Sequence, residues 1–102
     1  MHQYAFFARL RARRGREKEL EAFIEEGDRH TQADPDIVRS FSMKEADGIY
    51  CLFDVFESEA ARAAHFGGAT AKRLGSVTDT LLREAPEVRL LTIIRQKCSS
   101  DA

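Results

Sequence analysis

Hydrophobic and polar positions alternate along residues 3–13, and a period of two residues is typical of a β-strand with one buried face. From Glu17 the apolar positions change to helical spacing, which predicts an amphipathic helix that ends near His30 or Gln32. The sequence Ala33-Asp34-Pro35-Asp36 then predicts a turn, because the residue before a proline disfavours helical backbone and aspartate side chains bond nearby backbone groups.

The next segment, residues 37–56, contains two strand-like runs that flank an Asp47-Gly48 pair. This pair predicts a β-hairpin, since glycine adopts positive φ without strain. Counting outward from a two-residue loop gives the predicted cross-strand pairs: Ala46 with Ile49, Phe41 with Asp54, and Arg39 with Phe56. One face of the hairpin would then carry Ile37, Arg39, Phe41, Met43, Tyr50, Leu52, Asp54 and Phe56. A slip of one residue would move one strand's side chains to the other face.

The remainder of the chain predicts two helices and a final strand. Ser58 is a suitable N-cap for a short alanine-rich helix over residues 60–66, which Gly67-Gly68 would end. A second helix follows, and its periodic apolar positions predict an end at Arg83-Glu84. The apolar run 88–94 predicts a strand that is covered on both sides or paired across a dimer.

The order strand, helix, strand, strand, helix pair, strand is that of the ferredoxin-like fold, an α+β class with a split βαβ arrangement. We therefore predict a four-stranded antiparallel sheet whose one face is covered by the helices. Phe7 and part of the last strand would make the other face apolar. A homodimer in which two sheets pack face to face would bury this surface.

Length, charge and cysteine content narrow the classes of function. The 102 residues predict one domain over 1–102, with an ordered core over 3–95 and a flexible tail over 96–102. The formal net charge of −1 argues against a protein that acts mainly on nucleic acid or acidic membranes. No apolar run suits a membrane helix and no signal-peptide layout is present, so we expect a cytoplasmic protein. Cys51 and Cys98 are predicted to be reduced thiols, because they fit neither a disulfide framework nor a zinc site.

The segment from Asp54 to Phe66 resembles the antibiotic biosynthesis monooxygenase family, whose members are small dimeric α+β barrel proteins. The family pattern has an acidic residue two places before an aromatic residue at the end of the third strand, and then an alanine-rich helix that carries a histidine. Asp54, Phe56, Ala61 and His65 occupy these places. The likeness in order and spacing extends over residues 3–95.

The chain also departs from that pattern. Many members have glutamate in place of Asp54, tryptophan in place of Phe56, and a second histidine-phenylalanine pair where this chain has Gly68-Ala69-Thr70-Ala71. The resemblance implies an oxygenase that uses no flavin or metal and lets an electron-rich substrate anion react directly with O2. The same fold also hosts proteins that degrade haem, oxidise quinols or have no demonstrated chemistry.

His65 is the first candidate for chemistry, because histidine is the side-chain type whose ordinary pKa lies near neutrality. It either takes a proton from a bound phenol or quinol, or caps the end of its helix. Asp54 and Arg39 share an otherwise apolar predicted face, so they either orient a substrate, with Arg39 stabilising an oxyanion, or form a structural ion pair. The remaining candidates either line a pocket for an aromatic ligand or pack the core: Phe41, Tyr50, Phe56 and Phe66.

The sequence therefore favours a homodimeric monooxygenase-like protein that oxidises a quinol or polycyclic phenol and needs no cofactor. Two alternatives stay open. One is a non-catalytic dimeric module that binds a small ligand, which the missing second histidine-phenylalanine pair favours. The other is a haem-degrading enzyme with His65 as an axial ligand. No metal site is expected, because the three histidines, His2, His30 and His65, are widely separated and match no metal motif.

Overall fold

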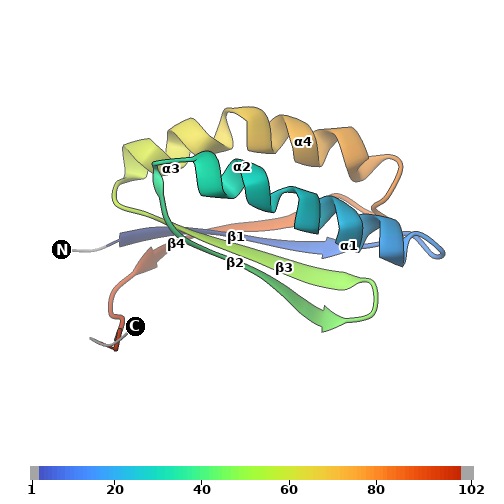
Figure 1. Cartoon of the computed structure of the whole chain (residues 1–102), viewed down its shortest axis with the longest axis horizontal. Coiled ribbons are helices and arrows are strands. Elements are labelled where there is room, and N and C mark those ends of the chain that lie inside the picture. Colours follow the sequence, from blue (N-terminus) through green and yellow to red (C-terminus); the bar gives the residue numbers. More distant parts are fainter. Residues whose placement is uncertain (1–2, 100–102) are drawn as a thin grey trace.

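The computed structural model describes residues 3–99, apart from the side chains of Phe66, Ala69 and Thr70. Its elements are β1 (Gln3–Arg11), α1 (Glu17–Glu26), α2 (Asp28–Ala33), β2 (Ile37–Ala46), β3 (Ile49–Phe56), α3 (Glu59–Phe66), α4 (Ala69–Thr78) and β4 (Glu87–Ile93). The strands form one antiparallel sheet in the order β2-β3-β1-β4. All the helices lie on one face of it (Figure 1). This topology confirms the predicted ferredoxin-like α+β fold.

The core lies between the helices and the helix-facing side of β1 and β3. Phe6, Ala8 and Leu10 alternate along β1 and are almost completely buried, as the period of two predicted. Leu20 attaches α1 to this core and is itself fully buried. Each large apolar side chain removed from water in this way contributes about 1.5–3 kcal/mol.

Two helices occupy the segment for which one helix was predicted. Gly27 separates α1 from α2, and its N–H lies 3.1 Å from the carbonyl oxygens of both Phe23 and Ile24. Its φ of −63° is still helical, so α2 continues in the general direction of α1 (Figure 1). α2 ends at Ala33, close to the predicted end. None of the helices within residues 3–99 is long and apolar enough to cross a membrane.

α4 ends at Thr78, so the predicted end at Arg83-Glu84 is wrong. The hydroxyl group of Thr78 donates to the carbonyl oxygen of Leu74, and such bonds compete with continued helix. The chain then turns towards β1, where Ala12 forms an isolated β-bridge with Leu82. Leu82 is buried although it lies outside the helix. Its helical spacing in the sequence therefore reflected burial rather than helical structure.

Three local motifs in the connections follow the sequence prediction. The N–H of Ala61 donates to Oγ of Ser58 at 3.0 Å, which makes Ser58 the N-cap of α3. The N–H of Asp36 donates to Oδ1 of Asp34 at 2.9 Å in the turn before β2. Gly48 has φ of +81° in the hairpin turn, a conformation that favours glycine.

The β2–β3 hairpin is regular at its turn and irregular in β2. Ala46 lies opposite Ile49 as predicted, but the next pair along the strands is Lys44 with Tyr50. Glu45 is therefore an extra residue on β2, which forms a β-bulge. A bulge of this kind is not encoded by the hydrophobic pattern of a single strand.

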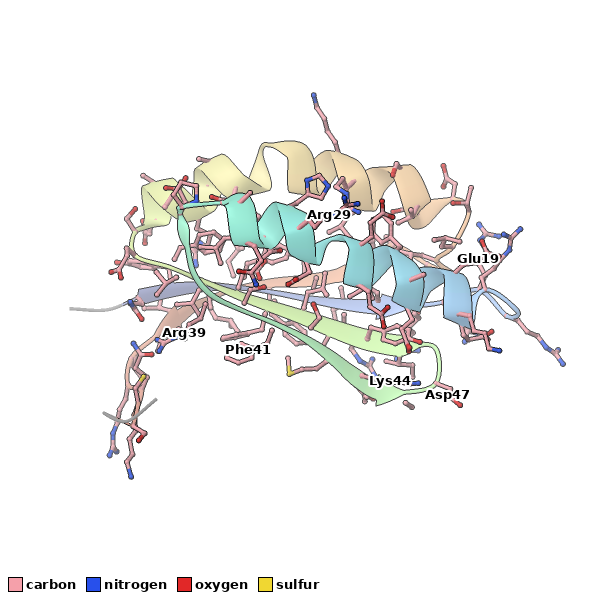
Figure 2. The ribbon with its side chains drawn as sticks, in the orientation of Figure 1. Glu19, Arg29, Arg39, Phe41, Lys44 and Asp47 are labelled. Carbon is pink, nitrogen blue, oxygen red and sulfur yellow. The ribbon has the colours of Figure 1, made fainter. Side chains whose placement is uncertain are left out.

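The bulge shifts by one place the pairing of the β2 residues that precede Glu45 in the sequence, so two of the predicted pairs are wrong. The observed pairs are Arg39 with Val55, Ser40 with Asp54, and Phe41 with Phe53. Arg39 and Phe41 consequently point away from the helices (Figure 2). Asp54 faces the helices, because it lines the cavity beneath them. A second irregularity returns Ile37 to the helix-facing side, opposite Phe56. The predicted common face of the hairpin is therefore divided between the two sides of the sheet.

The face of the sheet away from the helices carries exposed apolar side chains. Phe41 is 50% exposed, Met43 44% and Leu91 43%. Leu91 belongs to β4, which pairs with β1 at the edge of the sheet. One side of β4 is therefore not covered within this chain. The alternative prediction, that β4 pairs with a second copy across a dimer, stays a prediction.

Candidate functional site

The last turn of α3 places His65 against the sheet. Its side chain is 8% exposed, and its ring centroid lies 5.1 Å from that of Phe56 in β3. Nδ1 lies 3.1 Å from Oδ2 of Asp34, the residue that follows α2. Because an ionised carboxylate only accepts hydrogen bonds, Asp34 favours a proton on Nδ1 and leaves the lone pair of the neutral ring on Nε2.

A second carboxylate, that of Asp54 in β3, lies on the other side of the imidazole. Its Oδ2 is 3.7 Å from Nε2 of His65, and its Oδ1 accepts a hydrogen bond from Oγ of Ser40 at 2.5 Å. Burial raises the pKa of Asp54 above its ordinary value of 3.8, and the Ser40 hydrogen bond and the charge of His65 offset only part of this effect. Asp54 therefore binds a proton more readily than an exposed aspartate does.

Nε2 of His65 is buried and has no hydrogen-bond partner among the described residues. Burying a polar atom without a partner is unfavourable, and such atoms are rare in folded proteins. A proton on Nε2 would be attracted by Asp54, and the imidazolium would then lie between two carboxylates. The arrangement is suited to receiving one proton.

A cavity of about 410 Å³ lies between the α1–α2 segment, α4 and the helix-facing side of β2 and β3. Its apolar lining residues are Phe23, Ile24, Leu52 and Leu74. Its polar and charged lining residues are Glu25, Asp28, His30, Thr31, Ser40, Ser42, Asp54, His65 and Arg73, with Gly27 between them. This volume suits a small aromatic molecule.

A smaller, mostly apolar pocket of about 210 Å³ lies between α4 and the strands β1 and β4. His65 and Leu74 line this pocket and the larger cavity alike, so these two side chains separate them. Gly75 and Thr78 of α4 and Val88 of β4 also line the smaller pocket. His65 is therefore in contact with both spaces.

Three of the four aromatic residues predicted to bind a ligand do not line the cavity. Phe56 is fully buried in the core behind His65. Tyr50 is 4% exposed, its hydroxyl donates to Glu21 at 3.0 Å, and burial raises its pKa. Phe41 lies on the opposite face of the sheet. The side chain of Phe66 lies outside the described residues.

The expectation that Arg39 and Asp54 share one face of the hairpin is wrong, because the bulge places Arg39 on the face away from the helices (Figure 2). There Arg39 donates to Gln3 at 3.1 Å, to Cys98 Sγ at 2.9 Å and to Gln96. Its guanidinium therefore contacts the C-terminal segment and contributes no group to the cavity.

Neither cysteine forms a disulfide; Cys51 is half-buried and Cys98 is exposed. Within residues 3–99, no group of three or more His, Cys, Asp or Glu side chains is placed to hold a metal ion. The described part of the chain therefore offers no metal centre beside the cavity.

Three residues of the site were not identified from the sequence. Asp34 was interpreted only as a turn residue; it accepts a hydrogen bond in the turn and also contacts Nδ1 of His65. Ser40 was missed because it faces Asp54 only through the bulge at Glu45. Arg73 was one arginine among many, and no pattern indicated that its side chain would lie over Phe23 at the cavity.

The chain matches no protein-family model, and it matches no curated protein sequence. Its fold nevertheless occurs in solved structures. A protein of unknown function from Nitrosomonas europaea is 29% identical, with a TM-score of 0.90 over 98% of this chain and 97% of that chain. A protein from Mycobacterium tuberculosis is 21% identical, with a TM-score of 0.82 over 94% of this chain and 99% of that chain.

Some solved structures with this fold have names that suggest an activity. One is a candidate antibiotic biosynthesis monooxygenase from Caulobacter crescentus, which is 18% identical, with a TM-score of 0.74 over 91% of each chain. At this identity the likeness shows the fold. The chain therefore shares the ferredoxin-like α+β fold of proteins that include candidate antibiotic biosynthesis monooxygenases.

Proposed function

We propose that the cavity beside His65 oxidises a quinol or polycyclic phenol with O2 and needs neither flavin nor metal. The observation that supports this most is the imidazole of His65, which lies between Asp34 and Asp54 and whose buried Nε2 has no hydrogen-bond partner among the described residues. The fold shared with candidate monooxygenases supports the same reaction class.

In this proposal the Asp54–His65 pair takes the proton of the bound phenol. Asp54 lines the cavity, and its Oδ2 lies 3.7 Å from the buried Nε2 of His65. The hydroxyl group of the substrate therefore approaches Asp54, and the proton is stabilised between the two side chains. Asp34 keeps the imidazole oriented through Nδ1. Ser40 orients the other oxygen of Asp54.

Deprotonation makes the aromatic ring electron-rich enough to react with O2. The substrate loses two hydrogens and gains one oxygen atom on carbon, and the second oxygen atom leaves as water with those hydrogens. The substrate thus supplies all the electrons, so the reaction balances without an added reductant. Leu52 and Leu74 would contact the ring from opposite sides of the cavity, one from the sheet and one from α4.

Oxygen uptake by metal-stripped protein, with a panel of quinols and anthrone-like phenols, tests the proposal. We expect uptake above autoxidation for the wild-type protein and a fall of at least about 100-fold for His65→Ala, the usual contribution of a general base. Full uptake by a folded His65→Ala protein would overturn the assignment of His65.

A matched pair of variants separates the carboxylate beside His65 from other charge effects. Asp34→Asn removes the negative charge beside Nδ1 of His65, which stabilises a proton on the imidazole, and we expect reduced uptake. Asp36→Asn makes the same chemical change two residues away, on an exposed side chain outside the cavity, and should leave uptake unchanged. Equal losses in both variants would contradict a specific role for Asp34.

The second candidate function is a binding module for a small aromatic ligand without catalysis. The sequence Gly68-Ala69-Thr70-Ala71 favours it, because it stands where many members of the family that the chain resembles have a second histidine-phenylalanine pair. Under this alternative, ligands protect the protein against thermal unfolding but no oxygen is consumed. The cavity is open rather than filled by side chains, which both functions require.

Axial ligation of haem by His65 finds no support in this geometry. Nδ1 is bonded to Asp34, and Nε2 is buried and directed towards Asp54. Either nitrogen would have to be withdrawn from a carboxylate before it could bind iron. A Soret band from haem mixed with the protein, if lost in His65→Ala, would reverse this conclusion.

We also propose that a second copy of the chain covers the open face of the sheet. Phe41, Met43 and Leu91 are exposed there, and the ion pair between Arg9 and Glu45 beside them is neutral overall. An apolar centre with a charge-balanced margin is compatible with an identical surface. Light scattering should give twice the chain mass for the wild-type protein.

Phe41→Glu tests this interface by placing a charge at its centre, and we expect monomers. Leu90→Glu is the matched control, since Leu90 is equally exposed but its side chain points to the helix-facing side of β4. A wild-type protein that is monomeric at high concentration would overturn the proposed dimer.

A further inference from the structure

Arg73 of α4 presents an unpaired cation to the cavity. Its guanidinium carbon lies 4.5 Å from the centroid of the Phe23 ring of α1, and both residues line the cavity. Within the described part of the chain, no hydrogen bond or ion pair engages the Arg73 guanidinium. Its N–H donors are thus available to a ligand.

Arg62 shows that stacking on an aromatic ring does not by itself leave an arginine unpaired. Its guanidinium lies 5.4 Å from the Tyr4 ring centroid, and it also donates to the carbonyl oxygens of Ala5 and Leu91. Arg62 therefore has structural partners that Arg73 lacks among the residues that the structure describes. This contrast indicates that Arg73 has a role beyond attaching α4 to α1.

Gly27 leaves the space that Arg73 occupies. A Cβ atom added to Gly27 would lie 3.0 Å from Nη1 of Arg73, closer than ordinary contacts allow. The φ of Gly27 is −63°, which any residue adopts, so backbone conformation does not require glycine here. The lack of a side chain at the α1–α2 junction instead allows the guanidinium to lie against the helix.

The acidic residues of the cavity do not neutralise Arg73. Asp54 is engaged by Ser40 and lies beside His65, and Asp28 accepts a hydrogen bond from Gln32. Glu25 is exposed and lies beyond ion-pair distance of every described cation. The charge of Arg73 is therefore free to attract an anion into the cavity.

We propose that Arg73 binds a carboxylate of the ligand, so that the cavity selects hydroxylated aromatic acids. This inference rests on the proposed function of the same cavity and names its substrate class. A guanidinium presents paired N–H donors that match a carboxylate. With the carboxylate at Arg73, the ring contacts Leu52 and Leu74, and the hydroxyl group reaches Asp54 beside His65.

Calorimetric titration with 6-hydroxy-2-naphthoate, whose hydroxyl and carboxylate groups lie at opposite ends of the ring system, and with its neutral amide tests the inference. The two probes differ in charge and have nearly the same shape, and nitrogen-saturated buffer prevents oxidation. We expect the acid to bind the wild-type protein about tenfold more tightly than the amide, as one charge-assisted contact allows. Equal binding of the two probes would overturn the inference.

Three variants assign the preference to Arg73. Arg73→Gln should bind acid and amide equally, and Arg73→Lys should keep part of the preference. Lys72→Gln is the matched control: it removes the same charge from the neighbouring exposed residue, which does not line the cavity, and should keep the full preference. An undiminished preference in a folded Arg73→Gln protein would also overturn the inference.

Glu25→Gln provides a further comparison. This variant removes a negative charge from the cavity lining without touching Arg73, so it should bind the acid at least as tightly as the wild-type protein does. Weaker binding of the acid would contradict the assigned charge arrangement. Binding without oxygen uptake would leave this inference standing and remove the proposed oxidation. Oxygen uptake with neutral quinols, together with equal binding of the acid and the amide, would leave the proposed oxidation standing and overturn this inference.

Discussion

Ser40 lies directly opposite Asp54 in the β2–β3 pair, and its Oγ donates to Oδ1 of Asp54 at 2.5 Å. This contact exists because Glu45 forms a bulge near the turn; without the bulge, Phe41 would face Asp54. One extra residue in a strand thus decides whether a polar or an aromatic side chain accompanies the buried carboxylate. It also decides that Arg39 lies on the other side of the sheet.

Ser40→Ala should destabilise the protein by about 1–3 kcal/mol at neutral pH, because it leaves a buried carboxylate oxygen without its donor. Ser42→Ala is the matched control, since Ser42 lines the same cavity on the same strand. It should change the free energy of unfolding by less than about 0.5 kcal/mol. Urea denaturation of both variants measures the difference, and similar losses would contradict this role of Ser40.

The pKa of Asp54 predicts a pH dependence of stability. Burial raises it above 3.8 in the folded state, so the folded protein binds this proton more tightly than the unfolded chain does. The resulting stabilisation is complete below pH 3.8 and is lost as the pH rises through the folded-state pKa. The unfolding free energy of the wild-type protein, minus that of Asp54→Asn, should therefore fall across this range. A difference that stays constant in urea titrations would contradict the raised pKa.

Gly75→Ala should stabilise the protein by about 0.5–1 kcal/mol. Gly75 lies inside α4, and a Cβ atom at this position would meet no other atom within 4 Å. Alanine also restricts the unfolded chain more than glycine does. Thermal and urea denaturation measure the gain, and a loss of stability would indicate that the space beside Gly75 is filled.

Gly48→Ala should have the opposite effect, with a loss of about 1–2 kcal/mol. Gly48 has φ of +81°, and an added Cβ atom would lie 3.0 Å from Cγ of Glu17. The same chemical change is thus predicted to stabilise α4 and destabilise the hairpin turn. Urea denaturation of the two alanine variants in parallel tests this contrast, and equal effects would contradict it.

Leu20→Ala should cost about 2–5 kcal/mol, because Leu20 is fully buried where α1 meets the sheet. Lys18→Ala changes an exposed position of the same helix and should have little effect. Urea denaturation gives both values. A small cost for Leu20→Ala would mean that α1 is attached less firmly to the core than this packing indicates.

Local patterns were sufficient to predict the four strands, their order and which segments between them are helical. The alternation in β1, the Asp47-Gly48 turn and the Ser58 cap each depend on residues close together in the chain. His65 and Asp54 could be identified as candidates because a titratable residue stands out in an apolar pattern. Reliance on local spacing also placed the end of α4 too late. Leu82 has helical spacing in the sequence, but it is buried because it pairs with the chain just after β1.

The ferredoxin-like arrangement and two members of the candidate site follow from local patterns, because hydrophobic periodicity and turn chemistry act over short distances. Which side chains meet depends instead on how the strands pair and how the helices pack. The bulge at Glu45 depends on how β2 pairs across the sheet, and no pattern within β2 alone reveals it. The contacts of His65 with Asp34 and of Arg73 with Phe23 join segments that are distant in the chain, so they arise only when the helices pack on the sheet.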